Sequence, residues 1–110
     1  MTACNRSPME ESAKILRDMP RALLADVRDN VATLMASVQP RDEVMITSIE
    51  QINLGTVNLK DAVETFHKVS VRAIPAGDYV IKFGETIGVA SQLIPPGSHV
   101  HVHNVISDRL

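Results

Sequence analysis

The 110-residue sequence has little of several residue types, and each shortage excludes a class of protein. Cys4 is the single cysteine, so no disulfide can form within the chain, and we expect a reducing compartment such as the cytoplasm. Aromatic residues make up only 3%, which leaves few platforms on which nucleobases could stack. The net charge of -2 provides no basic surplus for nucleic acid or for an anionic membrane. The first residues lack the apolar segment of a signal peptide, and no apolar run is long enough to span a membrane.

Hydrophobic residues nevertheless make up 45% of the chain, so Val, Ile, Leu, Ala and Met must form the core. The length suits one small domain and leaves no room for a separate substrate domain beside it. We therefore expect any large active-site cleft to be shared with another domain or chain.

A short helix is predicted near the beginning of the chain. Ser7 and Glu10 have the spacing of a capping box, and Pro20 ends the helix because proline cannot continue it. We accordingly divide the chain into an N-terminal helical extension, residues 1–21, and a β domain, residues 22–110.

The β domain is predicted from short apolar segments rich in β-branched residues and separated by turn formers. These segments include EVMITSI, HKVSVRAI, YVIKF and TIGVA. A weak internal echo runs through residues 38–44, 74–80 and 94–100, in which Val or Ile is followed by a Pro-containing turn and then by Val. Gly77 and Gly97 are expected to supply the positive φ of two of these turns. Chance similarity among the turns is the alternative explanation.

The segment HVHVHNV carries three of the four histidines at two-residue spacing. Side chains alternate between the faces of a strand, so His99, His101 and His103 are predicted on one face, with Val100 and Val102 buried on the other. A solvated edge strand that happens to be rich in histidine is the alternative interpretation.

A metal site on this strand needs help from elsewhere. Histidines two residues apart start ~6.6 Å from each other, so two neighbours can reach one ion but three along a straight strand cannot. The site would use one H-x-H pair with further ligands, and His67 could come close across the sheet. Neighbouring imidazoles should also lower one another's pKa, which keeps them neutral. Since two imidazoles bind weakly, we expect the isolated chain to bind transition metals only weakly.

Two longer stretches carry a family resemblance: DNVAT at residues 29–33, and HKVSVRAIPAGDYVIKFGETIGVASQLIPPGSHVHVHN at residues 67–104. Together they resemble the N-terminal domain or small subunit of the altronate and galactarate dehydratase family, over roughly residues 22–106. The resemblance implies a mainly β, SAF-type β-clip domain of short strands. The sequence departs from the family pattern at Phe66, where glycine is usual, and in residues 1–20, which have no recognised counterpart.

The resemblance also implies an activity, a cofactor and a partner. The activity is elimination of water from a hexonic sugar acid with a divalent metal, Fe or Mn, in a site completed by a large catalytic subunit or domain. A homo-oligomer is left open. The implied site residues are His99, His103 and Asn104 for catalysis, His67 and Lys68 for substrate binding, and His101 and His103 for the metal.

Family members vary more at the position of His99 than at the other histidines. The small subunit of a sulfolactate sulfo-lyase is the first alternative function, and a non-catalytic carbohydrate-binding module is the second.

Overall fold

The computed structural model describes residues 19–107, which form β-strands joined by turns, without any helix among these residues. Accordingly, no helix that could cross a membrane is found in this part of the chain. The mainly β prediction is confirmed. The predicted N-terminal helix lies outside the described residues, and the division at residue 21 stays a prediction. The strands are β1 (Arg21–Leu24), β2 (Val31–Leu34), β3 (Glu43–Ser48), β4 (Asn53–Asn58), β5 (Lys68–Ser70), β6 (Tyr79–Lys82), β7 (Glu85–Ala90), β8 (His99–Val100) and β9 (Val105–Ile106).

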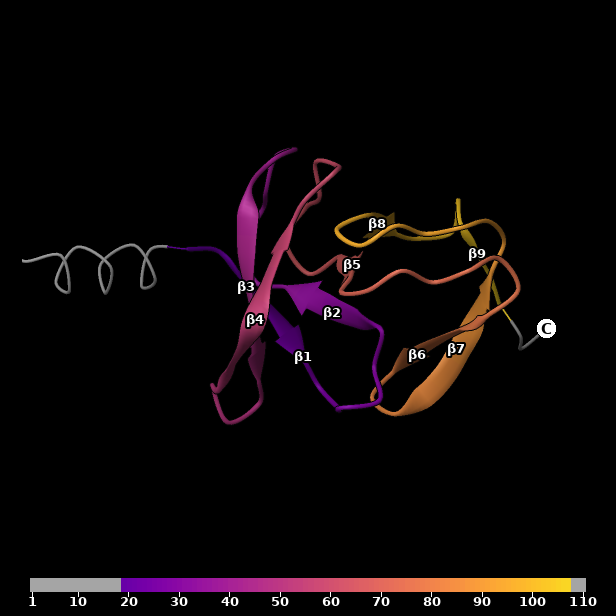
Figure 1. The fold of residues 1–110 in the computed structure, drawn as a ribbon, viewed down its shortest axis with the longest axis horizontal. Coiled ribbons are helices and arrows are strands. Elements are labelled where there is room, and N and C mark those ends of the chain that lie inside the picture. The colour runs from indigo at the N-terminus through magenta and orange to yellow at the C-terminus, as the bar shows by residue number, and fades with distance from the viewer. Residues whose placement is uncertain (1–18, 108–110) are drawn as a thin grey trace, which may run out of the picture.

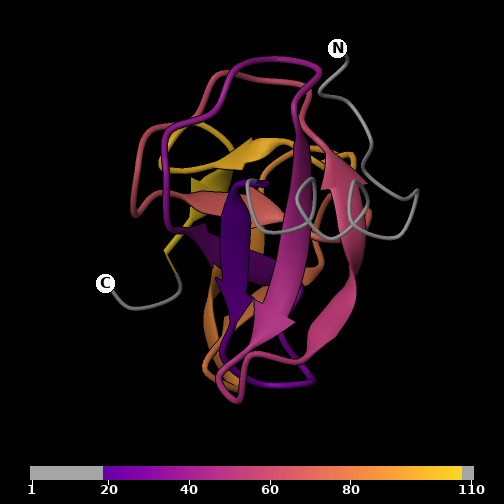
Figure 2. The same cartoon turned by 90° about the vertical axis from the view of Figure 1, so that its left-hand side faces the viewer.

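The strands form two sheets. The larger has six strands in the order β4-β3-β1-β2-β5-β8, and the smaller has the order β6-β7-β9. Strands β1 and β3 pair in parallel, and the other paired strands are antiparallel. Figure 1 shows β3 and β4 at one end of the described residues and the smaller sheet at the other. Seen from the first end, β1, β3 and β4 run side by side at the front (Figure 2).

Each end of the molecule has its own apolar cluster, as the high content of small aliphatic residues allows. One cluster consists of Ala22, Ala32, Leu34, Val38, Val44, Ile46, Val57, Leu59, Val63 and Val69. The other consists of Val31, Ile74, Val80, Ala90, Ile94 and Val100. Strand β2 contributes to both, because consecutive residues of a strand point to opposite faces. The short central strands therefore have apolar side chains packed against them on both sides.

One turn occurs four times among residues 19–107. In residues 38–44, 74–80 and 94–100, an isolated β-bridge residue is followed by a turn and then by a strand. The echo seen in the sequence is thus a structural repeat, and the positive φ predicted at Gly77 and Gly97 is confirmed. The fourth copy, residues 63–69, lacks Pro and Gly and was missed for that reason. It places Phe66 at a φ of 70°, the left-handed region that glycine normally occupies.

A buried carboxylate fastens the β6–β7 hairpin at its tip. We call residues 26–30 the carboxylate turn. Asp29 is 0% exposed and accepts hydrogen bonds from the backbone N–H groups of Phe83, Gly84 and Asp26, at 2.9, 2.7 and 3.1 Å. The neighbouring Asn30 extends the fastening, since its side chain bonds the backbone of β6 at both its amide oxygen and its amide nitrogen. Two residues of the DNVAT segment thus hold the smaller sheet against β2.

The histidine-rich segment is not one strand. Strand β8 ends at Val100, a turn follows over residues 101–104, and Val105 begins β9, which pairs with β7. Val100 is buried as predicted, but Val102 is 82% exposed, so the prediction that it is buried is wrong. Strict alternation fails because the turn reverses the chain direction after two strand residues, and the chain then joins the other sheet.

Candidate functional site

The pairing of β5 with β8 brings His67 beside His99. Lys68 lies opposite Val100 and Val69 lies opposite His99 in the antiparallel register. His67 immediately precedes β5, and its Nδ1 lies 2.9 Å from Nε2 of His99, at hydrogen-bonding distance. Two residues 32 positions apart in the sequence therefore meet at the edge of the six-stranded sheet. The expectation that His67 comes close across the sheet is confirmed.

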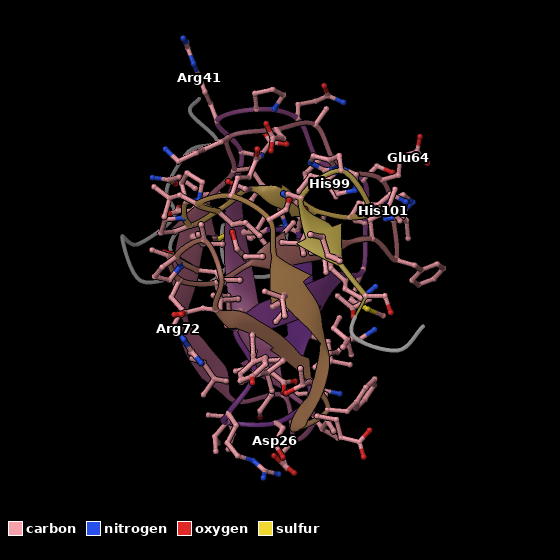
Figure 3. The ribbon with its side chains drawn as sticks, turned by 90° about the vertical axis from the view of Figure 1, so that its right-hand side faces the viewer. Asp26, Arg41, Glu64, Arg72, His99 and His101 are labelled. Atoms are coloured by element: carbon pink, nitrogen blue, oxygen red, sulfur yellow. The ribbon has the colours of Figure 1, made fainter. Side chains whose placement is uncertain are left out.

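His101 completes a group of three rings, which we call the histidine triangle (His67, His99 and His101). Its ring centroids are 5.1, 5.1 and 5.3 Å apart. One potential ligand atom from each ring can be chosen so that all three lie within 4.8 Å of one another. Figure 3 shows His99 and His101 next to each other. Among the described residues, this is the one group of three side chains found with the spacing of a metal site.

The turn over residues 101–104 is held by Asn104. Its Oδ1 accepts a hydrogen bond from the backbone N–H of His101 at 3.0 Å, and its Nδ2 donates one to the carbonyl of His99 at 2.9 Å. Asn104 is only 4% exposed, so both bonds are shielded from water. Its amide therefore fixes the backbone that carries two of the three rings. In the antiparallel register of β5 and β8, residue 101 is the next position opposite residue 67, so the turn begins where His101 meets His67.

The environment keeps His99 neutral. Burial lowers the pKa of His99 below its usual value, and the nearby imidazoles of His67, His103 and His101 lower it further. Asp61 acts in the opposite direction, and its carboxylate also accepts the backbone N–H of His99 at 2.9 Å. A neutral imidazole has the lone pair that a metal ion or a proton requires. The predicted lowering by neighbouring imidazoles is confirmed for His99.

An apolar pocket adjoins the triangle. Its volume is about 220 Å³, and its lining residues are Lys68, Ile87, Val100, His101, Val102, Val105 and Ser107. His101 thus belongs both to the pocket and to the triangle. Lys68 is the one lysine in the lining, and it is close enough to Lys82 to contribute to lowering the pKa of that residue, after the larger effect of burial.

The structure brings some of the site residues predicted from the sequence together and leaves others outside the group. It brings His67, His99 and His101 together, with Lys68 at the neighbouring pocket. His103, expected to share a metal with His101, lies outside the triangle, with its ring centroid 5.4 Å from that of His99. The side-chain amide of Asn104 forms hydrogen bonds with the backbone of His101 and His99. The catalytic, substrate and metal roles given to these residues stay predictions.

Sequence reasoning missed Asp61 and the turn before His67. No sequence pattern distinguishes Asp61, because a single carboxylate in a loop is usually a solvated surface charge. The turn of residues 63–69 did carry one: Val63 and Val69 have the six-residue spacing of the other copies. That spacing alone, without Pro or Gly, would have placed His67 at the same turn position as Ser98, beside a strand.

Comparison with known proteins gives consistent results. The model of the family described as the altronate/galactarate dehydratase SAF domain matches residues 20–108. An altronate dehydratase of Bacillus subtilis is 31% identical over 77 residues, which are 70% of this chain and 14% of that protein. The Escherichia coli altronate dehydratase is 38% identical over 76 residues, again 14% of its length. The α subunit of a (2R)-sulfolactate sulfo-lyase of Chromohalobacter salexigens is 43% identical over 51 residues, which are 46% of this chain and 54% of the subunit.

Proposed function

Because the chain belongs to the altronate/galactarate dehydratase SAF domain family, we propose that it is the small subunit or domain of a metal-dependent lyase that eliminates water from a sugar acid. The matched part spans a small fraction of the altronate dehydratases, so most of such an enzyme lies outside a domain of this size. The observation that carries the proposal is the histidine triangle. It gathers three imidazole side chains at one edge of a domain whose core is aliphatic.

Elimination next to a carboxylate needs three things of the protein. A base must remove the proton beside the carboxylate, an acid must protonate the departing hydroxyl, and a positive charge must stabilise the enediolate-like charge between these events. A divalent ion, Fe or Mn, would supply that positive charge when bound. The donor set fits Fe better than Mn, since His67, His99 and His101 offer three imidazole nitrogens within 4.8 Å and Mn prefers oxygen ligands.

The remaining roles fall to side chains beside the triangle. His103 is exposed and adjoins His99, so it is placed to exchange a proton with a bound acid and with solvent. The Lys68 ammonium at the pocket suits the substrate carboxylate. A polyhydroxylated carbon chain does not suit the pocket itself, because Ile87, Val100 and Val105 would leave its hydroxyls without partners. We assign the pocket to contact with the large catalytic subunit or domain.

A domain exchange tests the proposal. Residues 20–108 would replace the matching segment of the E. coli altronate dehydratase, and water elimination from altronate would be measured in the chimera. We expect the isolated chain to show no turnover and the chimera to be active. His101→Ala and His103→Ala chimeras should lose at least ~100-fold, the usual scale for a lost acid-base group. The matched control is Val27→Ala, an exposed valine outside the pocket that should keep full activity.

The second candidate is a sulfo-lyase, and one observation favours it. The matching sulfo-lyase subunit is a small chain of which 54% is covered, whereas 14% of each altronate dehydratase is covered. This chain should then replace the α subunit of the Chromohalobacter enzyme and restore release of sulfite from sulfolactate. Restoration there with an inactive altronate chimera selects the sulfo-lyase. If neither the altronate chimera nor the sulfo-lyase is active and the chain binds a carbohydrate, the chain is the non-catalytic module.

A further inference from the structure

We propose that this chain, without any partner, binds one divalent transition-metal ion through His67, His99 and His101, with His103 outside the ligand set. The inference deepens the proposed function, since it names the ligands of its metal, but it rests on geometry that an inactive protein would share. It changes two expectations from the sequence: that His101 pairs with His103, and that the isolated chain binds metals only weakly.

The spacing of the nitrogens supports three ligands. Imidazole nitrogens that share an ion at 2.0–2.1 Å lie ~3.0–3.4 Å from one another in tetrahedral or octahedral geometry. Nδ1 of His67 and Nε2 of His99 already lie 2.9 Å apart. One ligand atom chosen from each of the three rings lies within 4.8 Å of the other two. His101 is exposed, so its ring can rotate to bring a nitrogen closer to the other two.

The backbone holds the first two rings before any ion arrives. The carbonyl of His67 accepts the N–H of Leu34 at 2.9 Å, which ties His67 to the central strand β2. His99 is held on both sides, by Asp61 at its N–H and by Asn104 at its carbonyl. Ligands fixed in this way lose little conformational freedom on binding.

The chemistry of the group selects the class of ion. Three imidazoles with no carboxylate among them suit Zn²⁺, Co²⁺ or Ni²⁺, whereas Mg²⁺ and Ca²⁺ prefer oxygen ligands. Mn²⁺ should bind more weakly than these three, as it does at most nitrogen sites. Three protein ligands also leave coordination positions open, and His101 at the surface places them toward solvent.

The hydrogen bond between His67 and His99 provides a second readout. At 2.9 Å one of the two nitrogens must carry a proton, and that nitrogen cannot also bind an ion. Binding therefore requires the proton to move to the other nitrogen of the same ring. Such a change of tautomer is visible in ring nitrogen chemical shifts, and a purely structural histidine pair would not show it on addition of metal.

The experiment titrates the isolated chain with Co²⁺ and Zn²⁺. We expect one ion per chain with micromolar or tighter affinity, visible absorption bands of a Co²⁺ site with fewer than six ligands, and a tautomer change at the His67–His99 pair. His67→Ala, His99→Ala and His101→Ala should each weaken binding by ~100-fold or more, because losing a residue that merely orients a ligand already costs roughly 10- to 100-fold. His103→Ala, the matched control from the same turn, should stay within ~3-fold.

Two results would overturn the proposal. One is a loss of affinity in His103→Ala as large as that in His101→Ala. The other is the absence of stoichiometric binding by a chain whose circular dichroism shows it to be folded. If an alanine variant of His67 or His99 does not fold, His67→Gln and His99→Gln replace it, since glutamine keeps a hydrogen-bonding group. Metal binding with an inactive altronate chimera would leave this inference standing and reject the dehydratase.

Discussion

The carboxylate turn and the histidine triangle lie on opposite sides of the described residues, and their polar groups differ in burial and in hydrogen bonding. Figure 3 shows Asp26, at the start of the carboxylate turn, far from His99 and His101 of the histidine triangle. In the carboxylate turn, Asp29 is fully buried and receives three backbone N–H groups. In the triangle, the rings are half-buried or exposed, and the hydrogen bond between His67 and His99 is the one formed between them.

The contrast separates folding from binding. A buried carboxylate with its hydrogen-bonding capacity satisfied by backbone donors joins two segments and has little left to offer a ligand. Three imidazoles that face one another with one hydrogen bond between them contribute little to stability, and their ring nitrogens can still bind a cation. We therefore expect mutations in the carboxylate turn to change stability and mutations in the triangle to change binding.

The largest effect should come from Asp29→Ala. Three partly buried N–H groups lose a charged acceptor, which should lower the free energy of unfolding by about 3 to 5 kcal/mol. His101→Ala, at an exposed position, should change it by less than about 0.5 kcal/mol. Urea unfolding measures both. Asp29→Asn is the milder variant if the alanine variant does not fold, and Asp78→Ala is the exposed-carboxylate control. Equal losses for Asp29→Ala and His101→Ala would contradict the separation of roles.

The second effect concerns the support beneath the triangle. Val100 is 1% exposed and packs in the apolar cluster of the smaller sheet, so Val100→Ala should cost about 2 kcal/mol through lost burial and a cavity. Val102 is 82% exposed, so Val102→Ala should stay within about 0.5 kcal/mol. Thermal unfolding of the two variants provides the measurement. A similar loss from both would mean that the segment is a continuous strand after all.

The valine pair also shows how far the sequence could lead. Alternation predicted a strand with Val100 buried, and it was right up to the last residue of β8. It was wrong at Val102 because the turn depends on hydrogen bonds between the Asn104 side chain and the backbone of His99 and His101, which residue spacing does not reveal. The recurrent turns were visible where Pro and Gly marked them and invisible at residues 63–69. The same holds for the candidate site. The sequence identified His67 as a candidate, but which histidine lies beside it depends on the register of β5 and β8.

A smaller effect, a gain in stability, is expected at Phe66. Its φ of 70° costs a bulky side chain about 1 to 2 kcal/mol, and its ring is 68% exposed, so little burial offsets the cost. Phe66→Gly removes that strain but adds about 0.5 to 1 kcal/mol of chain entropy to the unfolded state, which leaves a net gain of about 0.5 to 1 kcal/mol. The midpoint of urea unfolding should rise accordingly. Glu64→Gly, in the same turn without a positive φ, should instead lower it.

Phe66 immediately precedes His67, so Phe66→Gly also tests whether the backbone strain at Phe66 affects metal binding. If Phe66 were part of how the triangle holds its ion, Phe66→Gly would weaken binding of Co²⁺ while it stabilises the fold. We expect unchanged affinity, because the backbone of His67 is tied to Leu34 independently of the ring at position 66. A tenfold weaker affinity would extend the site to include this turn.

The smallest effect should be a shift in one pKa without a measurable change in stability. The Arg28 guanidinium donates two hydrogen bonds to Asp26, at 2.9 and 3.0 Å, and the Arg28 backbone N–H donates a third at 2.9 Å. The side-chain bonds are the largest cause, and together with the backbone bond they lower the pKa of Asp26 from 3.8 to about 2. Because the folded-state pKa is the lower one, any stabilisation is complete above pH 3.8 and is lost as the pH falls toward 2.

Arg28→Ala removes the side-chain bonds and keeps the backbone one, so the pKa of Asp26 should rise part of the way from about 2 toward 3.8. Titration of the carboxyl carbon by NMR, with Arg41→Ala as a distant control, measures the shift. Both side chains are exposed to solvent, which screens the pair, so the unfolding free energy at neutral pH should hardly change. A carboxyl that still titrates near 2 in Arg28→Ala would place the cause in the backbone of the carboxylate turn. The turn would then bind its exposed carboxylate as it binds Asp29, through N–H groups alone, and the surface ion pair would be incidental to it.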